Sequence, residues 1–326
     1  MKKFLTVFLA VLTLAVVISA PFLLRKKSEG GGEKTVVLTL WHTDAFEGGK
    51  GSRCAFLRNV ASMYSKEHKG VYVLVSNYSP SGLKTALEGG KSADIISFGG
   101  CDLGVENYAK EIDFKVLDGG TVGKKRYAVS YLKGSYFEIV KGSGDKEIIL
   151  SKGEYTSPQT ACLFSNAKSD KYVMLPPADA YNRFLIASNA TLIGTQRDIV
   201  RLKNINAEFS ATPITTYNDL YQYLSLTTSD ESKVGYALDF IRYLLSSKVQ
   251  DRLSNLSMFS VNGARLYDGD EHFSLVENAK NEYTFIPFST KDNYDLLGNT
   301  AFSELEKGTN YDVIVNSCKN LINVVK

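Results

Sequence analysis

Polar and aromatic side chains directly follow two apolar runs of the chain, in the places where buried strands would end. These residues are Trp41, Thr43, Asp44, Ser97, Phe98 and Gly99. An indole ring can stack on a sugar ring or another apolar ligand surface, and hydroxyl and carboxylate groups beside it supply hydrogen bonds. The chemistry on offer is the capture of a small polar molecule. For Trp41 a position in the core is the competing interpretation.

A glycine-rich loop, Gly48 to Gly51, precedes a predicted helix that Ser52 would cap. Backbone N–H groups at the start of a helix can hold an anionic or hydroxyl group. The spacing differs from the G-x-x-x-x-G-K-[ST] pattern of a nucleotide-binding loop. Lys50 is therefore a candidate ligand contact, with a plain flexible loop as the alternative.

A second strand-to-helix turn lies further along the chain. The short apolar run 190–193 leads into residues that include Gln196 and Arg197. Both of these side chains are long enough to reach a cleft from such a turn, whereas Thr195 would serve as the helix cap. Gln196 and Arg197 are therefore further candidate ligand contacts.

Residue types that carry catalysis or bind metals are scattered along the sequence. The three histidines fall in unrelated segments without ligand spacing, so no metal site and no cofactor is expected. The sequence has no G-x-S-x-G nucleophile turn, and the acidic stretch 268–271 is typical of a solvated turn. The four cysteines form no C-x-x-C pair, which favours buried thiols, with a single disulfide as the alternative. The pattern predicts a binding protein and not an enzyme.

The elements that would position these residues alternate between strands and helices. Their expected ranges are a strand at 36–40, a helix from 52, a strand at 71–76, a helix near 83–87 and a strand at 94–98. This order indicates a βαβαβ unit with a parallel sheet, in which ligands bind beyond the carboxyl ends of the strands. Later helices are expected at 234–253 and 311–325, the first of which shows clear 3.6-residue spacing.

Length and charge narrow the class of protein. The chain has 326 residues, of which 44% are apolar and 22% charged, enough for one large domain or two lobes. Lys and Arg number 38 against 35 Asp and Glu, and several of the basic residues cluster near the N-terminus. The remaining body is nearly neutral, which excludes the basic face of a nucleic-acid-binding protein.

The segment 4–24 is apolar and uncharged, with basic residues on both sides. A membrane-spanning helix needs about 20 such residues. A cleaved secretory signal needs small residues at the cleavage site, but the best match, 18–20, begins with isoleucine and is followed by Pro21. We therefore expect an uncleaved anchor over 1–27 and a flexible linker over 28–34, with a cleaved signal as the alternative.

The stretch from Leu38 to Gly100 resembles the opening lobe of the maltose-binding-protein-like family of extracellular solute-binding proteins. Members of that family typically begin with a strand ending in Trp and a polar loop, and their third strand is of the D-I-I type found at 94–96. Segments 190–202, 224–253 and 285–297 fit the same family in the same order. The resemblance implies a periplasmic-binding-protein type II fold, in which two α/β lobes close by a hinge motion over a ligand.

The resemblance also implies how the chain divides. The expected ranges are 35–128 and 214–281 for lobe I, and 129–213 and 282–326 for lobe II. Tyr131 would lie in the hinge passage and Tyr217 near the second crossover, where aromatic rings suit a saccharide, although core packing explains tyrosines equally well. The region 131–206 is short for the family, and Ser130 stands where relatives often carry proline. The ligand contacts that the family makes through its second lobe are therefore the least transferable to this chain.

Together these features predict a membrane-tethered extracellular solute-binding protein of a bacterium. It would capture a small polar solute, by family habit a carbohydrate, and deliver it to the membrane subunits of an ABC importer. The cysteine that carries a lipid in many such proteins is missing near the end of the apolar segment. A ligand-sensing or interaction protein that kept the two lobes but does not serve transport is therefore the alternative.

Overall fold

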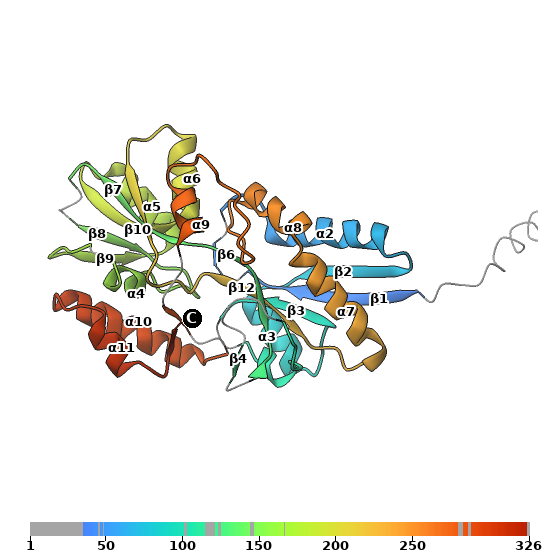
Figure 1. The fold of residues 1–326 in the computed structure, drawn as a ribbon. Helices are drawn as coiled ribbons and strands as arrows, with labels where there is room; N and C mark the ends of the chain where they lie inside the picture. Colours follow the sequence, from blue (N-terminus) through green and yellow to red (C-terminus); the bar gives the residue numbers. More distant parts are fainter. Residues whose placement is uncertain are drawn as a thin grey trace, which may run out of the picture.

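The computed structural model describes residues 35–44, 46–47, 49–100, 103–114, 121–122, 125–143, 147–165, 167–279, 283–285 and 288–324. These residues form two five-stranded sheets flanked by helices, with connecting segments between the sheets (Figure 1). The predicted α/β fold with two lobes is confirmed. The expected anchor and linker lie outside the described residues, and none of the described helices has the length and apolar character of a membrane span.

The first sheet has the strand order β2-β1-β3-β12-β6. Its strands are β1 (Val36–His42), β2 (Val71–Asn77), β3 (Ile95–Phe98), β6 (Val129–Lys133) and β12 (Tyr221–Leu226). Strand β1 is parallel to β2 and β3, and β12 is antiparallel to its two neighbours. The predicted βαβαβ unit is thus present.

Helices cover both faces of this sheet. They are α2 (Arg53–Glu67), α3 (Pro80–Glu88) and α7 (Glu231–Leu244). Leu57 and Phe240, from α2 and α7, pack in one core cluster with Leu38 and Leu40 of β1. Leu83 of α3 belongs to a second cluster on the opposite face. Leu38 and Leu40 thus face the first cluster, and Trp41, one residue further on, packs partly buried against the second, as period-2 patterning requires.

The second sheet has the order β11-β7-β10-β8-β9. Its strands are β7 (Tyr136–Lys141), β8 (Ile148–Ser151), β9 (Tyr172–Leu175), β10 (Ala190–Thr195) and β11 (Ser210–Ile214). The helices around it are α4 (Pro158–Leu163), α5 (Pro177–Ile186), α6 (Gln196–Asn204), α9 (Phe273–Asn278), α10 (Lys291–Glu306) and α11 (Asp312–Ser317). Phe184, Leu202 and Phe273 bury α5, α6 and α9 on one face. On the other face, Ala161 and Leu297 bury α4 and α10.

Short elements complete the described fold. They are η1 (Val105–Asn107), β4 (Thr121–Val122), β5 (Lys125–Arg126), α8 (Ser247–Gln250), η2 (Asp251–Leu256), β13 (Tyr283–Phe285) and β14 (Ile322–Val324). The prediction of one helix over 234–253 was wrong, because α7 ends at Leu244 and the chain turns at Ser246 before α8. The helix expected over 311–325 was too long, because 322–324 pair with β13 as a strand.

Within the described residues, three passages of chain run between the two lobes. They are Gly134–Ser135, 215–220 and 257–272. Gly134 N donates to the carbonyl of Leu220 at 2.7 Å, and Lys133 and Phe259 exchange backbone hydrogen bonds at 2.9 and 3.1 Å. A Cβ at Gly134 would stand 2.9 Å from the ring of Phe46, so a larger residue here would have to displace that ring.

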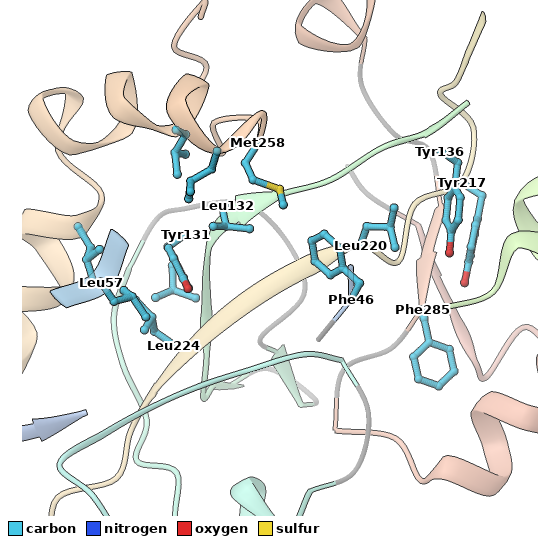
Figure 2. Close-up of a cluster of buried hydrophobic side chains, with 14 of the residues drawn as sticks. Phe46, Leu57, Tyr131, Leu132, Tyr136, Tyr217, Leu220, Leu224, Met258 and Phe285 are labelled. Atoms are coloured by element: carbon cyan, nitrogen blue, oxygen red, sulfur yellow. The ribbon is translucent and has the colours of Figure 1, made fainter. Parts of the chain in front are cut away.

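The chain passes between the two lobes at positions that differ from the expected ranges. Strand β6 still pairs within the first sheet, so the chain changes lobe at Gly134 and not at 128/129. Helix α9 packs in the core of the second lobe, although 214–281 was assigned to lobe I. Side chains from both lobes and from the passages between them meet in the cluster of Figure 2.

A half-buried carboxylate, Asp219, anchors the second passage to lobe II. Its oxygens accept hydrogen bonds from the hydroxyls of Tyr136 at 2.7 Å and Tyr294 at 2.8 Å, and from Ser157 N at 2.9 Å. Tyr217 adds a longer bond of 3.3 Å, and Figure 2 shows the hydroxyls of Tyr136 and Tyr217 pointing the same way. Burial raises the pKa of Asp219, while these donors act in the opposite direction. The donors compensate the carboxylate for the loss of water.

The turn from β10 into α6 holds a buried carboxylate, Asp198. Thr195 N donates to Asp198 Oδ2 at 2.9 Å, and the Thr195 side chain caps the helix in return. Gly194 permits this contact, because a Cβ there would stand 2.5 Å from the same oxygen. Burial raises the pKa of Asp198 to about 6. These contacts fix the position of the backbone at Arg197, at the start of α6.

Replacing Asp219 with alanine should lower the free energy of unfolding by about 3 kcal/mol, because buried hydroxyl and N–H donors lose their acceptor. Asp219→Asn keeps one carbonyl oxygen and should cost less. Denaturant unfolding measures both variants. Asp239→Ala, which removes an exposed carboxylate of α7, is the control and should stay within about 0.5 kcal/mol of the parent. Equal effects of Asp219→Ala and Asp239→Ala would contradict this role.

Asp198 predicts a pH dependence with a definite sign. Its pKa of about 6 in the folded protein lies above the unfolded value of about 3.9, so the stability from its protonated form is lost as the pH rises from about 4 to 6. Asp198→Asn cannot ionise, so the variant does not lose this stability as the pH rises. The unfolding free energy of the variant, relative to the parent, should therefore increase over this range by up to about 3 kcal/mol. Parallel stability curves from pH 4 to 7 would contradict the assignment.

Candidate ligand-binding site

A cleft of about 510 Å³ lies between the two lobes. Its lining residues are Asp44, Phe46, Glu47, Gly49, Gly51, Arg53 and Pro80 from the first lobe, and Gly153, Glu154, Tyr155, Thr156 and Arg197 from the second. They follow the carboxyl ends of β1, β2, β8 and β10. Open α/β sheets present ligands at this edge, so the cleft is the candidate site.

Asp44 is held at the first-lobe wall by two basic side chains. Its Oδ1 accepts from Arg53 Nε at 2.7 Å and lies 3.0 Å from His42 Nε2. Burial lowers the pKa of His42 against the opposing pull of Asp44. Burial acts to raise the pKa of Asp44, but the His42 hydrogen bond and the Arg53 charge bring it down to about 2. Asp44 is thus an ionised carboxylate beside a neutral imidazole at pH 7.

Behind His42, a buried hydrogen-bond network joins four strands. Ser97 Oγ lies 2.9 Å from His42 Nδ1 and 3.2 Å from the hydroxyl of Tyr131, and it accepts from Gln222 Nε2 at 3.1 Å. Serine, histidine and aspartate also form hydrolase triads. Here Ser97 is fully buried and held by three partners, so no substrate reaches its hydroxyl. The network fixes the position of Asp44.

Arg53 begins helix α2 directly after its cap, Ser52, whose hydroxyl accepts from Ala55 N at 3.2 Å. The guanidinium donates to Asp44 and to the carbonyl of Phe46, and its Cζ lies 4.4 Å from the centre of the Phe46 ring. Among the described residues, Arg53 Nη1 is buried and has no hydrogen-bond partner. A buried donor without an acceptor costs about 1–3 kcal/mol, so an acceptor supplied here would be stabilising.

Among the described residues, one ion pair spans the cleft. Glu47, in the loop after β1, pairs with Arg197, at the start of α6. Glu154 lies in the turn between β8 and α4, is exposed and forms no ion pair or side-chain hydrogen bond within the part of the chain that the structure describes. The lining thus combines paired charges, one unpaired carboxylate and the aromatic rings of Phe46 and Tyr155.

The predicted contact residues fall into three groups. Asp44 and Arg197 line the cleft, from opposite lobes. Lys50 is exposed between two lining glycines, and Trp41 is half-buried with its ring 4.9 Å from that of Tyr78. The remaining candidates are buried, and these are Thr43, Ser97, Phe98, Gly99, Tyr131, Gln196 and Tyr217. A ligand contact by any of these residues stays a prediction.

The buried candidates support the site from behind. Gln196 accepts from Ser135 N at 3.0 Å, next to the first passage between the lobes. Tyr217 stacks on Phe164, with ring centres 5.5 Å apart. Phe98 packs against aromatic rings in the core cluster of the first lobe. Each therefore holds an element that positions the lining.

Several lining residues were not singled out from the sequence. Phe46 and Glu47 lie in the same loop as the glycines that drew attention, and Arg53 directly follows the predicted cap. Those two signals could have found them. The turn 153–156 follows β8, a strand of four residues, and carries no motif that marks a site. The turn lines the cleft because of how the two lobes are arranged, which its own sequence does not indicate.

No family model and no curated relative matches the chain. Solved structures do. The sugar-binding protein MalE from Xanthomonas citri has a TM-score of 0.60 at 10% identity, covering 87% of this chain and 96% of its own. The GacH receptor of Streptomyces glaucescens has a TM-score of 0.54 at 14% identity, covering 88% and 97%.

Two further structures extend this comparison. CpMnBP1 with mannotriose bound has a TM-score of 0.56 at 13% identity, covering 88% of this chain and 99% of its own. Iron-bound HitA from Pseudomonas aeruginosa has a TM-score of 0.52 at 11% identity, covering 84% and 99%. These neighbours include a sugar-binding protein and proteins with acarbose, mannotriose or iron bound. At such identities the likeness establishes the fold, and the chain has the two-lobe α/β fold of ABC solute-binding proteins.

Proposed function

We propose that the chain is a solute-binding protein that captures a small carbohydrate between its lobes and delivers it to an ABC importer. The observation that carries this proposal is a cleft lined from both lobes, which are joined by three hydrogen-bonded passages. A ligand that touches both lobes binds the closed arrangement better and shifts the population toward it. That shift is what a transporter can detect.

The lining supports a carbohydrate ligand. Asp44 and Glu154 offer acceptors to sugar hydroxyls, Arg53 offers a donor, and Phe46 and Tyr155 offer faces on which a ring can stack. Among the described residues, no group of His, Cys, Asp and Glu side chains is arranged to hold a metal ion. The mannotriose in the CpMnBP1 structure is a ligand of the kind that these groups suit.

A second cavity, of about 500 Å³, is a weaker candidate for solute capture. It lies within the second lobe, between the segment after α4 and the α10–α11 connection, and its lining includes Cys162, Tyr172 and Tyr311. All its lining residues belong to one lobe. Movement of the lobes would not close it over a ligand, so it offers no signal to a transporter.

The membrane tether and the extracellular location are part of the proposal. The apolar segment 4–24 and the glycine-rich residues after it precede β1. An anchor of this kind would keep the lobes at the membrane surface, near the importer. The competing function is ligand sensing without transport. Deleting the gene should abolish uptake of the bound sugar if the chain serves transport, and leave uptake unchanged if it serves sensing.

Carbohydrate capture is tested by titrating the full-length chain, in mild detergent, with maltotriose, cellotriose and mannotriose. At least one should bind in calorimetry and change the fluorescence of Trp41, the sole tryptophan, which lies near the end of β1, the strand that leads to the cleft. Binding of none of these or of a wider saccharide panel would contradict the proposal.

Arg197→Ala should weaken binding of that trisaccharide by about tenfold, because it removes a second-lobe contact and the ion pair with Glu47. Arg265→Ala is the matched control, since Arg265 is exposed and does not line the cleft. Its affinity should equal that of the parent. Equal affinities for both variants would place the ligand elsewhere.

A further inference from the structure

The charges that line the cleft do not balance. Three carboxylates, Asp44, Glu47 and Glu154, face two guanidinium groups, Arg53 and Arg197. Asp44 pairs with Arg53, and Glu47 pairs with Arg197. The surplus is therefore one negative charge, and it is carried by Glu154 on the wall of the second lobe.

The turn that carries Glu154 directs its neighbouring cation away from the cleft. Gly153 N donates to Thr156 Oγ1 at 2.8 Å, which closes the turn. Lys152 Nζ donates to the carbonyl of Thr156 at 2.6 Å and lies 5.0 Å from the centre of the Tyr294 ring. Lys152 thus faces Tyr294, the partner of Asp219 in lobe II, and forms no ion pair with Glu154.

Among the described residues, Lys50 is a further cation beside the cleft, between the lining residues Gly49 and Gly51. It is exposed, and it is not among the residues that line the cavity. Water and salt screen both exposed charges, but only Glu154 belongs to the lining of the cavity. A ligand between the lobes therefore meets the charge of Glu154 more directly than that of Lys50.

Closure of the lobes would remove water from Glu154. An unpaired carboxylate that loses its water is destabilised unless a donor replaces the water. A sugar hydroxyl supplies a donor, but an ammonium group supplies a donor and the missing positive charge. Arg53 Nη1, which is buried without a partner among the described residues, needs an acceptor, and a sugar hydroxyl or ring oxygen is one.

We propose that the cleft selects a cationic amino sugar, as a short oligosaccharide, over its neutral and acidic counterparts, and that Glu154 is the residue that determines this preference. The inference rests on the proposed function, that the cleft binds a saccharide. The amine meets Glu154 of the second lobe, and hydroxyls of the same ligand meet Asp44 and Arg53 of the first. An acidic sugar would face the surplus negative charge and bind most weakly.

Calorimetry on the full-length chain in detergent compares three trisaccharides of the same linkage: cellotriose, its fully 2-amino counterpart and its uronic-acid counterpart. We expect the amino trisaccharide to bind about fivefold to tenfold more tightly than cellotriose at low salt, because one added ion pair in a partly solvated cleft has this effect. The advantage should shrink as salt is added. The uronic trisaccharide should bind most weakly.

Glu154→Gln should reduce the ratio of the amino and neutral affinities to about twofold or less. Glu306→Gln, which removes an exposed carboxylate of α10 outside the cleft, should leave the ratio as in the parent. Two results would overturn this inference and leave the proposed function intact. Either the neutral trisaccharide binds as tightly as the amino trisaccharide, or the amino trisaccharide keeps its advantage in Glu154→Gln. If none of the three trisaccharides binds, and no other neutral saccharide binds, both this inference and the proposed function are overturned.

Discussion

The approach of the Gly134 backbone to Leu220 is the constraint on which the two-lobe arrangement depends. A side chain at Gly134 would crowd Phe46 and Gln196, and the N–H and carbonyl groups of Gly134 bond to the second passage. The third passage pairs with Lys133 immediately before it. Because these passages lie against one another, the two lobes meet where the passages cross, beside the buried cluster that both lobes share.

Hydrogen-bonded polar groups hold the second passage and the end of β1 in fixed positions beside the cleft. Asp219 holds the second passage against lobe II, and Ser97 and Gln222 hold the end of β1 from behind. A buried polar group stabilises a fold only when its partners are present, so these networks require defined positions of the strands around them. Asp44 and Arg53 are therefore set before any ligand arrives. An interaction prepared in this way costs less ordering when a ligand binds.

The first lobe was largely predictable because its strands carry continuous apolar runs and its helices begin at recognisable caps. The position of each strand-end side chain was less predictable. Ser97 and Tyr131 are residue types that suit a cleft and a buried network equally well, and only the direction of the side chain decides between them. A one-residue change along a strand moves a side chain to the opposite face. Asp44 and Arg197 reach the cleft because each lies just beyond the last paired residue of its strand.

The second lobe was harder to predict for a different reason. Strand β8 is short, and Glu154 and Tyr155 follow it in a turn without a motif. Their role depends on contacts between segments far apart in the sequence, which local periodicity does not encode. The helix boundaries after Val234 failed similarly, because a turn at Ser246 interrupts an apolar pattern that continues through it.

A crystal structure of the chain with a bound trisaccharide is the most direct test of the central claim, which is that the cleft between the lobes holds the ligand. The account predicts the sugar in contact with Asp44 and Arg53 on one side and with Tyr155 and Arg197 on the other. A sugar found in the cavity beside Tyr172 and Tyr311, or touching only one lobe, would contradict it.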